Sequence, residues 1–111
     1  MKKKDIVKES NDFNNIIKKG HKLYNRSFAI YYRKNDYSKN RFGVSVGTKL
    51  GNAVFRNKYK RKIRMIITTN MSKLKFNGYD CIIILRKTGS FLTYQQLENE
   101  YLELINKLKE N

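Results

Sequence analysis

The lysine and arginine side chains are the residues of this sequence best suited to binding a ligand. Many of them lie between Asp36 and Asp80, where no acidic residue occurs. Spacings of three and four residues place several of them on one side of a helix, beside an apolar side. Like charges at this spacing destabilise an isolated helix by about 0.2–0.5 kcal/mol per pair, so a partner with negative charge is favoured. The alternative is a solvated surface, although such surfaces usually mix Glu with Lys. The basic side comprises Arg56, Asn57, Lys60, Arg61 and Arg64.

The pair Gly51 and Asn52 stands where this helix should begin. Glycine relieves steric limits at the change from strand to helix, and asparagine can cap a helix N-terminus. An open helix N-terminus beside Lys49 would attract an anion. An ordinary cap is equally compatible with the spacing, since most helices need one.

Protein-based catalysis is not indicated, because the sequence offers no convergent set of acids, bases or metal ligands. His21 is the only histidine and follows Gly20 at an expected helix end, where a surface turn residue is the simpler interpretation. Cys81 is the only cysteine and lies in an apolar run, as expected of a core thiol. We expect no catalytic residue and no metal site on this chain.

The amino-acid composition limits the classes of partner that the protein is expected to bind. The 111 residues carry a formal charge of +16, from 25 Lys and Arg against nine Asp and Glu, so a polyanion is the expected partner. The longest apolar run, Cys81 to Leu85, is far below the roughly 20 residues that span a membrane. The start MKKKDIVKES lacks the apolar segment of a secretory signal, so a cytoplasmic protein is expected.

Periodicity divides the chain into six expected elements within a single domain, residues 1–111, in which residues 1–8 are a candidate disordered segment. The two strands nearest the N-terminus are expected to pair as a hairpin, and the third strand is apolar enough to occupy the sheet centre. Helices and strands in this order predict an α+β sandwich. The first expected helix runs from the cap Ser10 to Gly20, and the expected strands are Arg26–Lys34, Arg41–Gly47 and Tyr79–Leu85. A second helix is expected from Asn52, and its buried side comprises Phe55, Tyr59, Ile63, Ile66 and Ile67. A final helix is expected to begin at a Thr93/Gln96 capping box, and its apolar side comprises Tyr94, Leu97, Tyr101, Leu104, Ile105 and Leu108.

The segment GNAVFRNKYKRKIR, Gly51 to Arg64, resembles the signature of the bacterial ribonuclease P protein component. Further agreement comes from Asn25-Arg26 before Phe28, from RFGVSV, and from LRK followed by a Leu-Thr-Tyr helix start, so the resemblance spans nearly the whole chain. Two positions depart from the family pattern. Thr48 stands where a basic residue is frequent, and Ile17 stands where an aromatic residue is common.

The resemblance implies a subunit of the ribonuclease P holoenzyme, an endoribonuclease that removes the 5′ leader of precursor tRNA. It implies that the RNA subunit is the catalyst and holds most of the Mg²⁺, and that no membrane or obligate protein partner is needed. The implied fold is a two-layer α+β sandwich of a mixed sheet and three helices, similar to ribosomal protein domains. Its element order is α-β-β-(β)-α-β-α, with an optional third strand and a left-handed βαβ crossover.

Two sets of site residues follow from the resemblance. The leader-binding cleft would lie between the first helix and the sheet, although Phe13 and Ile17 fit an ordinary core equally well by pattern. Single-stranded bases stack on aromatic rings such as that of Tyr31, which is expected on the strand face opposite Phe28. The implied catalytic-RNA-binding residues are Lys49, Asn52, Arg56, Asn57, Lys60, Arg61 and Arg64, and the implied leader-binding residues are Phe13, Ile17, Tyr31 and Arg86.

Two other classes share the charge and the element pattern. One is a ribosomal protein or assembly factor, a binding module without enzymatic activity. The other is a DNA-binding or membrane-surface protein that uses the basic helix. The nature of the bound RNA separates the first class from ribonuclease P, and competition among RNA, duplex DNA and anionic vesicles separates the second.

Overall fold

A computed structural model describes residues 6–7 and 11–108 of the chain. The elements are α1 (Asn11–Lys19), β1 (His21–Tyr24), β2 (Phe28–Lys34), β3 (Arg41–Ser45), α2 (Ala53–Asn70), β4 (Tyr79–Leu85) and α3 (Tyr94–Ile105). The four strands form one mixed sheet in the order β1-β2-β4-β3. The expected cap at Ser10 and most of residues 1–8 lie outside the described part. Among the described residues, no helix has the length and apolarity needed to cross a bilayer.

The expected hairpin between β2 and β3 is wrong, because β4 lies between them. β4 runs antiparallel to β2 and parallel to β3. Almost every side chain of β4 is buried, so the strand needs a neighbour along each edge and a cover on each face. Burial of this apolar strand therefore outweighs the local pairing of two segments adjacent in sequence. Its expected place at the sheet centre is confirmed.

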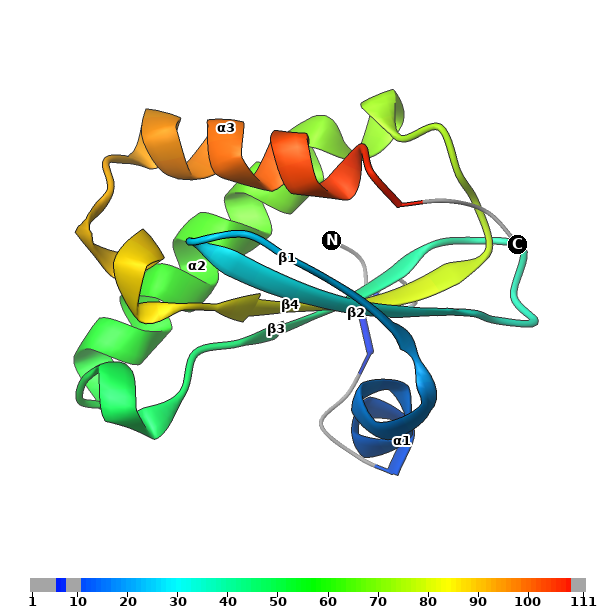
Figure 1. Ribbon diagram of the computed structural model, residues 1–111, viewed down its shortest axis with the longest axis horizontal. Helices are drawn as coiled ribbons and strands as arrows, with labels where there is room; N and C mark the ends of the chain where they lie inside the picture. Colours follow the sequence, from blue (N-terminus) through cyan, green and yellow to red (C-terminus); the bar gives the residue numbers. More distant parts are fainter. Residues whose placement is uncertain (1–5, 8–10, 109–111) are drawn as a thin grey trace.

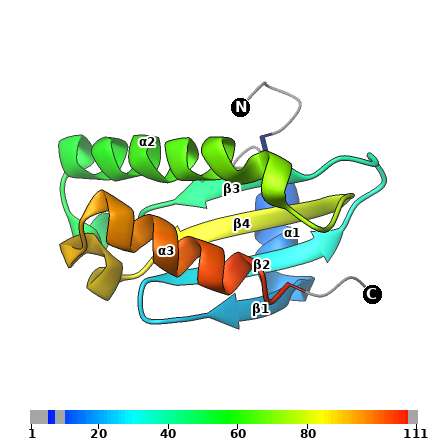
Figure 2. The same cartoon turned by 90° about the horizontal axis from the view of Figure 1, so that it is seen from above.

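The connection from β3 through α2 to β4 has an uncommon hand. Figure 2 views the sheet from the side that carries α2. When the shared direction of β3 and β4 is taken as upward, β4 lies to the left of β3, which makes the crossover left-handed. Nearly all such crossovers in proteins are right-handed. The expectation of a left-handed unit agrees with this arrangement.

The strand β1 was located only by the structure. It pairs antiparallel with β2, and the two strands are joined by Asn25–Ser27. Three of its four residues are exposed, so it lacks the alternation of apolar and polar residues that identifies a strand. His21, expected in a surface turn, is instead the exposed first residue of β1, and its ring lies 5.3 Å from that of Tyr32. The observed order α-β-β-β-α-β-α contains the strand that was optional in the expectation.

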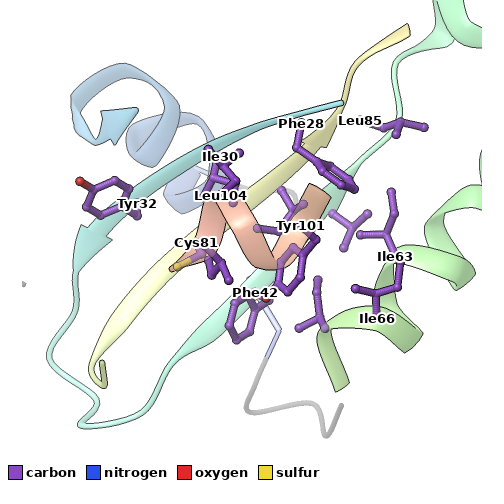
Figure 3. Packing of buried hydrophobic residues seen from close by; sticks show 14 of the residues in the cluster. Phe28, Ile30, Tyr32, Phe42, Ile63, Ile66, Cys81, Leu85, Tyr101 and Leu104 are labelled. Atoms are coloured by element: carbon purple, nitrogen blue, oxygen red, sulfur yellow. The ribbon is translucent and has the colours of Figure 1, made fainter. Parts of the chain in front are cut away.

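The helices are divided between the two faces of the sheet, with α2 and α3 on one face and α1 on the other (Figure 1). The larger core lies beneath α2 and α3, where Tyr101 is fully buried and meets Phe28 edge to face at 6.3 Å (Figure 3). The Thr93/Gln96 capping box is present. The expected buried positions are confirmed except Phe55, which is half-buried, and Tyr94, which is exposed. The α+β class with a mixed sheet and three helices is likewise confirmed.

Candidate nucleic-acid interface

The N-terminus of α2 is formed as the sequence indicates. The Oδ1 atom of Asn52 accepts a hydrogen bond from the backbone N–H of Phe55 at 2.9 Å, which is the expected cap. Gly51 is required by space rather than by its backbone angles, because a Cβ at this position would lie 2.6 Å from Cδ1 of Phe55. Lys49 is exposed in the 3-10 turn Thr48–Leu50 immediately before the helix. A cation and a helix N-terminus thus occupy neighbouring positions, which suits an anion.

The basic side of α2 borders its buried side. Arg56 and Lys60 are half-buried, whereas Asn57, Arg61 and Arg64 are exposed. The helix packs on the sheet through Tyr59, Ile63, Ile66 and Ile67, all of them buried. The implied RNA-binding residues of α2 therefore form one continuous side of the helix, which extends from the edge of its buried side to its exposed surface. This basic side begins in the first turns of the helix, just after the cap residue Asn52.

The helix α2 itself, Ala53–Asn70, contains no acidic residue. Within the described residues, none of the α2 cations forms an ion pair with a carboxylate, and the first turn contains no acidic residue. The Nε atom of Arg56 is buried and has no hydrogen-bond partner among the described residues. A buried donor without a partner costs about 1–3 kcal/mol, and a phosphate oxygen could accept its hydrogen bond only if the Arg56 side chain turned outward, because the atom is not accessible at the surface. This arrangement suits phosphate groups.

The opposite face of the sheet carries a second, smaller apolar cluster beneath α1. It contains Val7, Phe13, Ile16 and Ile82, and the partly buried Ile17, Tyr31 and Ile84 pack against it. Phe13 is only 8% exposed, and its Cε2 atom would lie 3.1 Å from a Cβ added to Gly43. Phe13 is thus chiefly a packing residue in the free protein, whereas Ile17 and Tyr31 retain accessible surface. The structure brings these three implied cleft residues together.

Arg86, the fourth implied cleft residue, follows the end of β4 and is exposed. Its Nη1 atom donates a hydrogen bond to the backbone carbonyl of Asn25 at 2.6 Å. Its Cζ atom lies 5.7 Å from the ring centroid of Tyr24, and Nζ of Lys22 lies within 5.4 Å of the rings of both Tyr24 and Tyr31. Arg86 is thereby connected to Tyr31 through two β1 residues that sequence reasoning missed. Recognising β1 as a strand, together with its register against β2, would have placed Lys22 and Tyr24 on the face that carries Tyr31.

The buried titratable side chains Cys81 and Tyr101 contribute to packing rather than to a reactive site. Burial raises the pKa of the Cys81 thiol, with a smaller contribution from Asp80, so the thiol stays protonated and unreactive. Burial likewise raises the pKa of Tyr101. Within the described residues, no group of three His, Cys, Asp or Glu side chains could hold a metal ion.

Comparison with known proteins agrees with this geometry. The family model described as Ribonuclease P matches residues 1–109. A ribonuclease P protein component from Mycoplasma mycoides is 41% identical over 109 residues, which cover 98% of this chain and all of that protein. One from Streptococcus agalactiae is also 41% identical, over 95% of this chain and 94% of that protein.

Solved structures give the same result. The ribonuclease P protein from Thermotoga maritima superposes with a TM-score of 0.86 at 30% identity, covering 95% of this chain and 98% of that one. The Staphylococcus aureus protein superposes with a TM-score of 0.81 at 38% identity, covering 90% of this chain and 91% of that one. The fold, the helix that carries the basic side and the full-length similarity together lead to one assignment. The chain belongs to the ribonuclease P protein family.

Proposed function

We propose that the protein is the RNA-binding subunit of ribonuclease P and uses two separate surfaces. The first is the basic side of α2 with Lys49 and Asn52, which would bind the catalytic RNA. The observation that carries this proposal is the unpaired charge of α2, whose cations have no carboxylate partner among the described residues. Phosphate oxygens would supply the counter-charge.

The second surface is the sheet face beside α1, which would receive the 5′ leader of precursor tRNA. Single-stranded RNA binds to aromatic rings by stacking and to cations through its backbone. Tyr31 offers a partly exposed ring, and Arg86 offers an exposed guanidinium. Phe13 and Ile17 would support the floor of this site, since both pack in the cluster beneath α1. The two surfaces lie on elements that cover opposite faces of the sheet, so both RNAs can bind at once (Figure 1).

In this proposal the protein binds and orients RNA, and the chemistry belongs to the RNA subunit. Hydrolysis at the leader junction would use Mg²⁺ held mainly by the RNA. We place the complex in the cytoplasm, with precursor tRNA as its substrate and without an obligate protein partner. The strongly positive chain, +16 in total, would also reduce repulsion between two polyanions brought together.

Reconstituted cleavage tests the proposal. Catalytic RNA and precursor tRNA are incubated at a low Mg²⁺ concentration with and without the protein, and release of the leader is followed. We expect the protein to increase cleavage strongly, because its cations replace part of the screening that Mg²⁺ provides. A ribosomal-type RNA-binding protein of similar charge serves as the control and should give little stimulation. Absence of stimulation by this protein would refute the proposed role.

A further inference from the structure

The sheet face that carries α1 continues past the helix as a strip of strand residues on which Lys22 and Tyr24 are exposed and Ala29 is buried. β1 forms the outer edge of this strip and pairs with β2 so that Lys22 lies opposite Tyr31 and Tyr24 lies opposite Ala29. All four side chains belong to the same face. Tyr24 is 66% exposed, whereas Tyr31 is partly covered by the cluster beneath α1. An aromatic ring is therefore available one diagonal step from Tyr31.

Cations flank both rings. Nζ of Lys22 lies 5.3 Å from the ring centroid of Tyr24 and 5.4 Å from that of Tyr31, so one ammonium group is shared by two tyrosines. The Cζ atom of Arg86 lies 5.7 Å from the Tyr24 centroid. These distances fall within the range of cation–π attraction. Tyrosine and cation thus alternate along the strip in the order Tyr31, Lys22, Tyr24 and Arg86.

The end of this strip is held in place by the connection between β1 and β2. The Oδ1 atom of Asn25 accepts hydrogen bonds from the backbone N–H groups of Ser27 and Phe28, at 2.9 and 2.8 Å. The backbone N–H of Arg86 donates to the carbonyl of Ser27 at 2.8 Å. A carboxylate oxygen of Glu100, on α3, accepts from Oγ of Ser27 at 2.8 Å. Tyr24 therefore projects from a backbone that is already fixed, which lowers the entropy lost on binding.

An alternation of exposed ring and cation matches the repeating unit of a single-stranded nucleic acid, in which a base alternates with a phosphate. Diagonal neighbours in an antiparallel pair lie about 7–8 Å apart, a spacing that adjacent bases of an extended strand can span. Resting on the leader-binding role proposed above, we propose that Tyr24, with Lys22 and Arg86, is a second stacking site for the leader. The Tyr24 site binds the nucleotide adjacent to the one at Tyr31. The leader-binding surface thereby extends beyond the part of the sheet that α1 covers.

The test uses the reconstituted holoenzyme and precursors whose leader is shortened one nucleotide at a time, together with mature tRNA. Tyr24→Ala should weaken binding of the long-leader precursor by about 5- to 150-fold, the loss expected for one stacked base. It should also reduce the leader length beyond which further nucleotides add no affinity. Binding of mature tRNA and of the catalytic RNA should not change. Tyr24→Phe retains the ring and should bind like the unaltered protein.

Tyr37→Ala is the matched control, since Tyr37 is a 59% exposed tyrosine with Cζ of Arg41 at 4.2 Å from its ring, in the loop beyond the other end of β2. It should leave leader dependence intact. Leader dependence that survives Tyr24→Ala would overturn this site while leaving the proposed function standing. An unaltered holoenzyme without leader dependence would overturn both. Equal weakening of mature and leader-bearing tRNA by Tyr24→Ala would also overturn it, because the residue would then act on the fold.

Discussion

Asp80→Asn should destabilise the protein far more than any exposed charge substitution. Asp80 is 1% exposed and accepts hydrogen bonds from Nε and Nη2 of Arg41, at 2.8 and 2.7 Å, and from Nδ2 of Asn35 at 2.8 Å. The side chain of Arg41 is itself only 16% exposed. Removing the carboxylate charge takes from this guanidinium the counter-charge that it binds through two hydrogen bonds, in a place that water reaches poorly. Breaking such a buried pair typically costs about 3–5 kcal/mol.

That cost is a large part of the total, since domains of this size are stable by only about 5–15 kcal/mol. We therefore expect the denaturation midpoint in urea, followed by circular dichroism, to fall markedly with an unchanged dependence on denaturant. Asp36→Asn is the control, because Asp36 is exposed and its replacement changes the net charge by the same amount. It should stay within about 0.5 kcal/mol of the unaltered protein. Equal effects of the two substitutions would refute the argument from burial.

Two further predictions concern the elements that hold the proposed sites. Glu100→Gln should lower the free energy of unfolding at neutral pH by about 1–2 kcal/mol, a modest loss because Arg26 is 63% exposed. Hydrogen bonds from Arg26 and Ser27 lower the pKa of Glu100, so its contribution is complete above the unfolded-state pKa of about 4.3 and is lost as the pH falls through the lower folded-state pKa. The difference in unfolding free energy between the unaltered protein and Glu100→Gln, measured by chemical denaturation, should therefore shrink in acid. A difference that grows in acid would contradict the stabilising role of the ionised Glu100. Glu103→Gln, which changes an exposed carboxylate, is the control. Asn52→Ala should cost about 1 kcal/mol by thermal unfolding through loss of the cap, and a cost no larger than that of Asn57→Ala would show that the cap contributes little.

Helical periodicity predicted α2 and α3 well because each helix buries one continuous side. Tyr59 and Ile63 are buried on α2, and Leu97 and Tyr101 are buried on α3. The central position of β4 was also predictable, since only a strand covered on both faces is apolar almost throughout.

Strand pairing was less predictable, because proximity in sequence favours a hairpin between β2 and β3. The structure instead inserts β4, which arrives from the far end of α2. Nothing local in the sequence specifies this insertion, which depends on the total burial achieved by the sheet. The position of β1 was missed for a related reason: its residues are mostly exposed, so the strand is defined by its hydrogen bonds to β2 rather than by an apolar pattern.

The candidate sites divide in the same way. The α2 surface was visible in the sequence, because its residues lie close together on one helix. The leader surface depends on neighbours from α1, β1, β2 and β4, so only its aromatic and apolar residues could be proposed in advance. Lys22 and Tyr24 acquired their place beside Tyr31 only through the register of β1 against β2.

Binding of the two RNAs as a function of salt tests the two-surface proposal most directly. Arg56→Ala combined with Arg61→Ala should weaken binding to the catalytic RNA and reduce the slope of log affinity against log salt by about 1.4–1.8, the value for two lost phosphate contacts. Lys73→Ala combined with Lys75→Ala removes the same charge from exposed lysines outside α2 and should change that slope much less.

Tyr31→Ala completes the measurement. It should leave affinity for the catalytic RNA unchanged and should weaken the leader-bearing precursor relative to mature tRNA, since it removes a stacking ring rather than a charge. The account predicts this crossed pattern, in which each variant affects one RNA. Equal effects of the α2 variant and of Tyr31→Ala on both RNAs would contradict it.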